Sequence, residues 1–155
     1  MTDDDIFRLL LVGIFFAIVP FAVLHRIRSG TDEKLDRWQE GAFILFGLRL
    51  GALPWFLASL AWMINPQWMA WAFVPIPIWL RWCGLLFIGM WAVLLVWTFR
   101  NLGKNLTDTV VTRKEHSLVT TGPYRHVRHP FYLAFFLAAL GGSMVAANWF
   151  LLFAG

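Results

Sequence analysis

Four long apolar segments set the architecture that this chain can adopt. They cover about residues 6–25, 42–64, 78–98 and 130–147 of the 155-residue sequence. A helix needs about 20 apolar residues to cross the hydrocarbon core of a bilayer, and the first three segments reach that length. Only 14% of the residues are charged, against about 25% in soluble domains. We therefore predict an all-α integral membrane protein with about four transmembrane helices.

The residues at the two ends of the chain help to assign the first and last apolar segments. The N-terminus is acidic from Asp3 to Asp5, and it lacks both the basic region and the small-residue cleavage site of a secretory signal peptide. We therefore expect the first segment to be a retained membrane helix. Asn148 interrupts the last apolar run, and residues 149–155 have the composition of the start of a return helix. A single domain over residues 1–155 is the simplest organisation.

The charges of the loops predict the orientation of the helices. The loop before the second helix carries four Lys or Arg residues and the loop after the third carries six, whereas residues 65–77 carry none. Short cytoplasmic loops have an excess of Lys and Arg, so we expect the first and third loops in the cytoplasm and the N-terminus outside. Trp68 and Trp71 of the outer loop then suit an interfacial aromatic belt. This topology accounts for the net charge of +4, and we expect no nucleic-acid binding.

The fourth segment has a pattern of small residues. They recur every four positions, at Ala134, Ala138, Gly142 and Ala146, with Ala139, Ser143 and Ala147 in a neighbouring row. Small residues at this spacing let helix backbones approach closely in a membrane. The pattern predicts an ordinary helix contact on this face.

One arginine lies inside each of the second and third apolar segments. Arg49 is about a third of the way into the second helix, and Arg81 is one turn inside the third. An unpaired charge near the bilayer centre costs at least ~2.5 kcal/mol on insertion scales. We expect Arg49 to reach toward the cytoplasmic face, with pairing to an acid as the alternative, and Arg81 to reach the outer headgroups.

The most chemically varied residues lie just before the fourth segment. From His116 to Tyr132 the sequence has His-Ser-Leu-Val-Thr-Thr-Gly-Pro-Tyr, three residues, then Arg-His-Pro-Phe-Tyr. The Gly-Pro pair is a turn signal, and Pro130 suits the first turn of a helix, where its missing N–H costs nothing. Singly, the cations follow the charge rule and the tyrosines suit interfacial anchoring. Their combination at fixed spacing predicts a preorganised functional site. The Arg-His pair lacks the spacing of metal ligands, so we expect no metal.

This segment resembles the signature of the isoprenylcysteine carboxyl methyltransferase and phospholipid methyltransferase superfamily, whose members are integral membrane enzymes that use S-adenosylmethionine. The similar stretch runs from about Leu102 to Asn148. The resemblance implies that residues 1–155 form a membrane methyltransferase-like domain, with a cytoplasmic cofactor-binding segment before the fourth helix. The residues it implies for the cofactor pocket are His116, Ser117, Leu118, Val119, Tyr124, His129, Pro130, Phe131 and Tyr132.

The chemistry of such residues suits methyl transfer. An aromatic face such as that of Tyr124 or Tyr132 can stabilise a sulfonium cation by ~0.5–2 kcal/mol, and His129 can bind the carboxylate or the adenosine of the cofactor. We expect transfer to a small or lipid-borne acceptor that enters from the bilayer, with a carboxylate, an amine or a thiol as the accepting group. An amine or thiol must lose a proton, and either His116 or His129 can take it, so the catalytic residues stay unassigned.

The sequence departs from the family pattern at its C-terminus. Family members continue into a complete return helix and a cytoplasmic tail with an Arg and a Glu-Glu pair, whereas this sequence ends at Gly155 and has no acid after Glu115. We therefore expect a C-terminally truncated form, and activity of these 155 residues alone is in question.

Two alternative functions stay open. Sterol reductases share a similar Arg-His-Pro-x-Tyr element and use NADPH, so NADPH but not S-adenosylhomocysteine would protect such a protein from heat. A non-catalytic, truncated membrane partner would respond to neither ligand.

Overall fold

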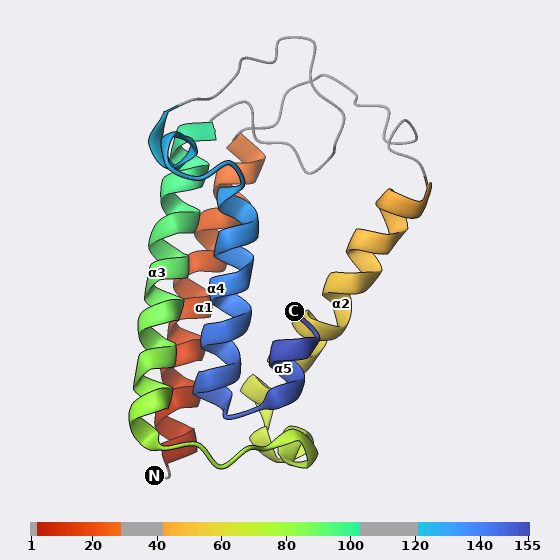
Figure 1. Ribbon diagram of the computed structural model, residues 1–155, viewed down its shortest axis with the longest axis vertical. Coiled ribbons are helices and arrows are strands. Elements are labelled where there is room, and N and C mark those ends of the chain that lie inside the picture. Colours follow the sequence, from red (N-terminus) through yellow and green to blue (C-terminus); the bar gives the residue numbers. More distant parts are fainter. Residues whose placement is uncertain (1–2, 29–41, 103–120) are drawn as a thin grey trace.

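The computed structural model describes residues 3–28, 42–102 and 121–155, and within these it leaves the side chains of residues 26, 28 and 42–52 undescribed (Figure 1). The described residues form α1 (Asp3–Arg28), α2 (Ala42–Ile64), η2 (Pro66–Ala72), α3 (Ile78–Leu102), η4 (Gly122–Arg125), α4 (Pro130–Ala146) and α5 (Trp149–Phe153). Here η denotes a 3-10 turn. Among these residues the pairing of Phe73 with Asn148 is an isolated β-bridge and not a strand. The predicted all-α fold class is confirmed for the described part of the chain.

Helices α1, α3 and α4 pack side by side as a bundle, and α2 leans away from them (Figure 1). The C-terminal half of α2 meets α5 and the bundle, while its N-terminal half diverges. The N-terminus and η2 lie at one end of the bundle, and η4 lies at the other. Residues 121–132, which hold the described part of the predicted site, are therefore separated from the aromatic loop of η2 by the length of the helices.

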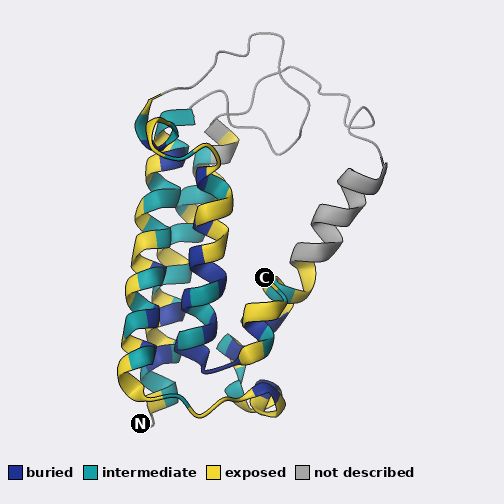
Figure 2. Ribbon diagram, in the orientation of Figure 1, coloured by how far each residue is buried: buried dark blue, intermediate teal, exposed yellow. Residues whose placement is uncertain are grey.

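Two helices of the described residues are long and apolar enough to cross a membrane, at Asp3–His25 and Ile78–Leu102. Shorter apolar helices lie at Leu53–Ile64 and Pro130–Ala146. Large apolar side chains on the outer sides are exposed, as Phe16 and Leu86 illustrate at 69% each. Figure 2 shows the buried residues gathered between the helices, mainly in the half that holds the N-terminus and α5. Exposed apolar surfaces of this kind suit a lipid environment, and the number of spans and their orientation stay predictions.

Helices α3 and α4 approach closely at two glycines. A Cβ at Gly141 would lie 2.8 Å from the carbonyl oxygen of Gly84, and a Cβ at Gly84 would lie 2.9 Å from the carbonyl oxygen of Gly141. Ala134, Ala138 and Ala146 of the predicted small-residue row are buried, so this face of α4 packs inside the protein. The close approach to α3, however, uses Gly141 instead of Gly142, around whose Cβ position no described atom lies within 4 Å.

We expect Gly141→Ala to destabilise the protein by about 1–3 kcal/mol, because the added methyl group meets backbone atoms that cannot rotate away. Gly142→Ala is the matched control, since it changes the same residue type one position along the same helix. It should leave the free energy of unfolding unchanged or slightly higher. Thermal unfolding in detergent measures both, and equal losses for the two variants would contradict this account of the contact.

The buried guanidinium of Arg81 joins three helices. Its Nη1 atom lies 2.7 Å from Oδ1 of Asp4 in α1, and its Nε–H donates to the carbonyl oxygen of Val145 at 2.8 Å. Its Cζ atom lies 4.3 Å from the centre of the Phe7 ring. Val145 is in the last turn of α4, where carbonyl groups have no intrahelical donor. Arg81 satisfies one of these groups while Asp4 balances its charge.

The expectation that Arg81 reaches the outer headgroups is therefore wrong. Only 7% of the residue is exposed, because its partners are supplied inside the protein by helices distant in the sequence. The corresponding expectation for Arg49 concerns a side chain that lies outside the described residues.

The ion pair predicts unequal costs for removing its two members. Asp4→Ala leaves a guanidinium buried without its counter-charge, which costs about 3–5 kcal/mol. Arg81→Met keeps most of the side-chain volume and leaves Asp4, whose side chain is 44% exposed, free to be hydrated. The main loss is then the unpaired carbonyl of Val145, at about 1–3 kcal/mol.

Chemical or thermal unfolding of the two variants measures this difference. Arg100→Ala serves as the control, because Arg100 is exposed and its loss should change stability by no more than about 0.5 kcal/mol. A larger loss for Arg81→Met than for Asp4→Ala would show that the hydrogen bond outweighs the charge balance.

The predicted turn at Asn148 joins α4 to α5. Ala147 has a φ of +50°, and the Asn148 side chain accepts from the N–H of Leu151 and donates to the carbonyl oxygen of Met69 at 3.0 Å. Val74 N–H also donates to the carbonyl oxygen of Ala147 at 2.8 Å. The end of α4 is thus held to the η2 loop, far from residues 121–132.

Candidate functional site

The described part of the predicted site packs against the last turn of α3. The sequence predicts an end near residue 98, but α3 continues to Leu102. The added turn brings Phe99 and Asn101 against the segment that leads into α4, and Trp97 lies just before it. The polar residues Arg100 and Asn101 end the apolar run, so hydropathy alone places the end of the helix too early.

Gly122 begins the η4 turn and lies directly against the last turn of α3. Its φ is +62°, in the left-handed region that favours glycine, and an added Cβ would collide with the Asn101 side chain. Asn101 is itself held by a hydrogen bond from its Nδ2 to the carbonyl oxygen of Trp97 at 2.8 Å. The turn closes with the N–H groups of His126 and Val127, which donate to the carbonyl oxygen of Pro123. The predicted Gly-Pro turn is confirmed.

Two prolines anchor the segment at either side of the turn. Pro123 and Pro130 are both less than 2% exposed. Pro130 is the first residue of α4, as its position in the sequence predicts, and His129 precedes it as the N-cap residue. The N–H of Leu133 donates to the carbonyl oxygen of His129 at 3.2 Å. Each proline fixes its own φ and restricts the residue before it, so the backbone is constrained on both sides of the intervening residues.

The first turn of α4 presents two different faces. Phe131 is half-buried, and its ring lies 5.6 Å from that of Phe99 on α3. His129 and Tyr132 lie on the exposed side with their ring centres 5.4 Å apart, and Tyr132 is 70% exposed. Of the predicted site residues described, Pro130 and Phe131 therefore hold the segment to α3, while His129 and Tyr132 together face outward.

Tyr124 lies within η4 and is half-buried. This burial raises the pKa of the Tyr124 phenol above its ordinary value of 10.0, because desolvation disfavours the phenolate. The group therefore stays protonated at neutral pH and can donate a hydrogen bond to a ligand.

The raised pKa of Tyr124 predicts how stability changes at alkaline pH. The unfolded chain loses the phenol proton near pH 10, before the folded protein does, so ionisation favours unfolding and the free energy of unfolding falls as the pH rises above about 10. In Tyr124→Phe this contribution is missing. Denaturant unfolding of both proteins between pH 8 and 11 should show a steeper loss for the wild type, and parallel curves would contradict the burial of the phenol.

The remaining predicted site residues, His116, Ser117, Leu118 and Val119, lie outside the described residues. The described half of the site has groups that fit the cofactor implied by the sequence. The exposed ring of Tyr132 suits a sulfonium cation, and the exposed His129 beside it offers a hydrogen-bonding group. The exposed guanidinium groups of Arg125 and Arg128 suit the carboxylate of its amino-acid part.

His25 is a residue that sequence reasoning missed. It lies near the end of α1, and its Nε2 atom is 2.7 Å from the carbonyl oxygen of Phe99. The signal available in the sequence is a single histidine placed where the first apolar segment meets its predicted cytoplasmic loop. Its partner is 74 residues away, so the sequence alone does not pair the two.

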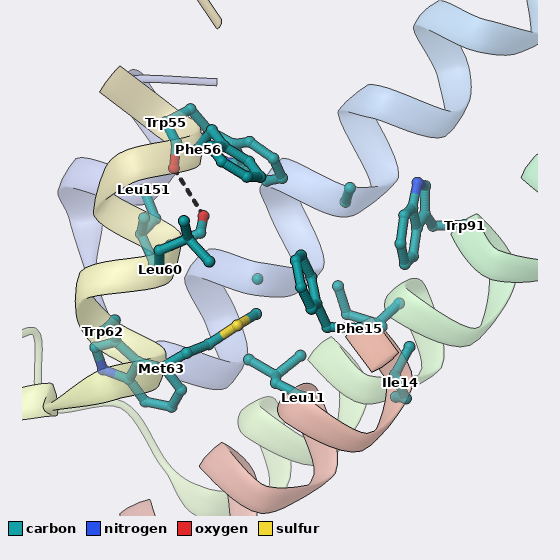
Figure 3. Close-up of a pocket in the computed structure, with 14 residues that line it drawn as sticks. Leu11, Ile14, Phe15, Trp55, Phe56, Leu60, Trp62, Met63, Trp91 and Leu151 are labelled. Atoms are coloured by element: carbon teal, nitrogen blue, oxygen red, sulfur yellow. Dashed lines mark hydrogen bonds between the residues drawn. The ribbon is translucent and has the colours of Figure 1, made fainter. Parts of the chain in front are cut away.

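A separate pocket lies between α2 and the bundle (Figure 3). It has a volume of about 80 Å³ and is lined by residues of α1 to α5 that include Leu11, Phe15, Trp55, Met63 and Trp91. A hydroxyl group in this lining, on Ser59, donates to the carbonyl oxygen of Trp55 at 2.8 Å (Figure 3). Apolar walls of this kind do not compensate a charged sulfonium or carboxylate. The polar segment at 121–132 is therefore the better candidate for the cofactor.

Comparisons with known proteins match a longer region that includes this segment. Residues 82–154 match the isoprenylcysteine carboxyl methyltransferase (ICMT) family. A protein-S-isoprenylcysteine O-methyltransferase of Schizosaccharomyces pombe is 44% identical over 48 residues, which are 30% of this chain and 20% of that relative. The match therefore spans about a fifth of the relative's length. These findings confirm the superfamily resemblance that residues 116–132 predict, and the family match includes most of α3 together with η4, α4 and α5.

Proposed function

We propose that this protein, a member of the isoprenylcysteine carboxyl methyltransferase superfamily through residues 82–154, transfers a methyl group from S-adenosylmethionine to a small or lipid-borne acceptor at the membrane surface. The observation that carries the proposal is the exposed ring pair of His129 and Tyr132, held on the last turn of α3 inside the matched region. The named relative acts on an isoprenylcysteine group, which supports an acceptor with an apolar part.

S-adenosylmethionine supplies an electrophilic methyl group on a sulfonium centre, and transfer of that group leaves the neutral thioether S-adenosylhomocysteine. The face of the Tyr132 ring stabilises such a cation by ~0.5–2 kcal/mol. Arg125 and Arg128 pair with the carboxylate of the ligand, and the protonated phenol of Tyr124 donates to an acceptor atom. These roles bind and orient the ligand and require no covalent bond to the protein.

The proton balance depends on the class of the acceptor. As the accepting atom bonds to the methyl carbon, the bond from that carbon to sulfur breaks. A carboxylate enters already ionised, whereas an amine or a thiol must release one proton, for which His116 and His129 are the candidate bases. Holding the two reactants in line can contribute ~7–11 kcal/mol to the acceleration. A turn fixed by two buried prolines suits a reaction that depends on position.

The membrane topology forms part of the proposal. We propose about four spans, with the N-terminus outside and the site on the cytoplasmic side. Two long apolar helices and the separation of η4 from η2 along the bundle support this arrangement. It would let a soluble cofactor reach residues 121–132 while the acceptor enters from the lipid.

The ligand affinity of Tyr132→Ala tests the proposed site. Titration calorimetry of the full chain in lipid nanodiscs should show S-adenosylmethionine binding weakened by about 2- to 30-fold. S-adenosylhomocysteine should be affected less, because it lacks the sulfonium charge. The unfolding temperature should stay the same, since Tyr132 is 70% exposed.

Trp68→Ala is the matched control for that experiment. Trp68 is another exposed aromatic residue, at 59%, and it lies in η2 at the opposite end of the bundle, so both affinities should be unchanged. Unchanged affinities in Tyr132→Ala would refute the assignment of the pocket. If NADPH bound to the wild type and both adenosyl ligands failed to bind, the reductase alternative would replace the proposed function.

A further inference from the structure

We infer that His25 of α1 is a positioning residue for the cofactor site, acting through the last turn of α3. The inference rests on the proposed function for the identity of the ligand. Its structural basis is a hydrogen bond to α3 combined with a stack of aromatic rings that reaches the first turn of α4. Helix α1 lies outside residues 82–154, so this support comes from beyond the region that matches the family.

The hydrogen bond is made to a carbonyl group at the end of a helix. Phe99 is among the last four residues of α3, whose carbonyl groups have no intrahelical donor. Its oxygen lies 2.7 Å from Nε2 of His25. Because a carbonyl oxygen only accepts, Nε2 must carry the hydrogen, which determines the tautomer of a neutral ring. Leucine or phenylalanine at position 25 would fill the space and leave the carbonyl unpaired.

Aromatic contacts link this hydrogen bond between α1 and α3 to the first turn of α4. The ring of His25 is nearly parallel to those of Phe21 and Phe99, with ring centres 5.7 Å and 5.9 Å away and interplanar angles of 10° and 21°. Phe99 in turn lies 5.6 Å from Phe131. A continuous chain of ring contacts therefore leads from α1 through α3 to the segment that presents His129 and Tyr132.

The same end of α3 makes two further contacts with the site, one from this turn and one from Trp97 just before it. Asn101 packs against Gly122, and the Trp97 ring lies 6.3 Å from that of His126. A small rotation of this turn would therefore move η4 and the start of α4 together. By tying the Phe99 carbonyl to α1, His25 restricts that rotation and holds the exposed ring pair in position.

Hydrogen exchange of the ligand-free full chain in nanodiscs tests this inference. The reporters are the amides of His126, Val127 and Leu133, which donate within η4 and the first turn of α4. We expect His25→Phe to accelerate their exchange by about 2- to 12-fold, the factor expected for the loss of one hydrogen bond. His25→Gln keeps an N–H donor and should restore exchange to near the wild-type rate.

Two controls separate positioning from general destabilisation. Ser59→Ala removes another side-chain bond to a helix carbonyl, in α2, and should leave the three reporters unchanged. In His25→Phe the amides of Val74 and Asn148, which are bonded near the α4–α5 junction, should exchange as in the wild type. Equal acceleration at both ends of the bundle, or none at residues 126–133, would overturn the inference.

The affinity for S-adenosylhomocysteine, measured by calorimetry, then links the position of the segment to ligand binding. We expect His25→Phe to weaken binding by about 2- to 12-fold and His25→Gln to recover it. Faster exchange at unchanged affinity would overturn the role in the cofactor site. If the wild type itself bound no adenosyl ligand, the proposed function would fail, and the exchange rates would still decide whether His25 holds residues 122–133.

Discussion

The buried guanidinium of Arg81 is the interaction on which the arrangement of the helices depends. A charge at this depth is tolerated because Asp4 of α1 balances it and the terminal carbonyl of Val145 in α4 accepts from it. These partners determine how α1, α3 and α4 lie along one another. Since a helix has a fixed rise per residue, alignment at this end carries through to the other, where His25 of α1 meets Phe99 of α3. Helix α1 is thus tied to α3 by a polar contact near each of its ends.

The two ends of the bundle differ in what they offer to a ligand. Near the N-terminus, Nε and Nη1 of Arg81 and the side-chain amide of Asn148 contact partners inside the protein. At the other end, the last turn of α3 packs against η4, and His129 and Tyr132 are exposed. Methyl transfer requires oriented reactants and a stabilised cation more than it requires a covalent partner. In the proposed reaction, a short segment held against a helix end would supply that orientation with few residues.

Much of the fold follows from local pattern. The apolar run of α2 begins after the charged loop and ends before Asn65, so the observed Ala42–Ile64 has the bounds expected from hydropathy. Pro130 starts α4 because its ring fits the first turn. The sequence pattern predicts the structure wrongly where a tertiary contact outweighs the local preference. Helix α3 continues through Arg100 and Asn101, beyond the end of its apolar run. The glycine of α4 that contacts α3 is Gly141, because the rotation of α4 about its axis depends on the helices around it.

Composition and residues close together in the chain were enough to predict the all-helical class, the turn before α4 and the resemblance to the superfamily. Tertiary structure decided the partners. The sequence around Arg81 predicts a contact with lipid headgroups, and only the folded structure brings Asp4 to it. His25 likewise gains its role from Phe99, a residue on another helix. Hydropathy reports how much a segment favours lipid over water, whereas pairing between distant residues depends on how the helices pack.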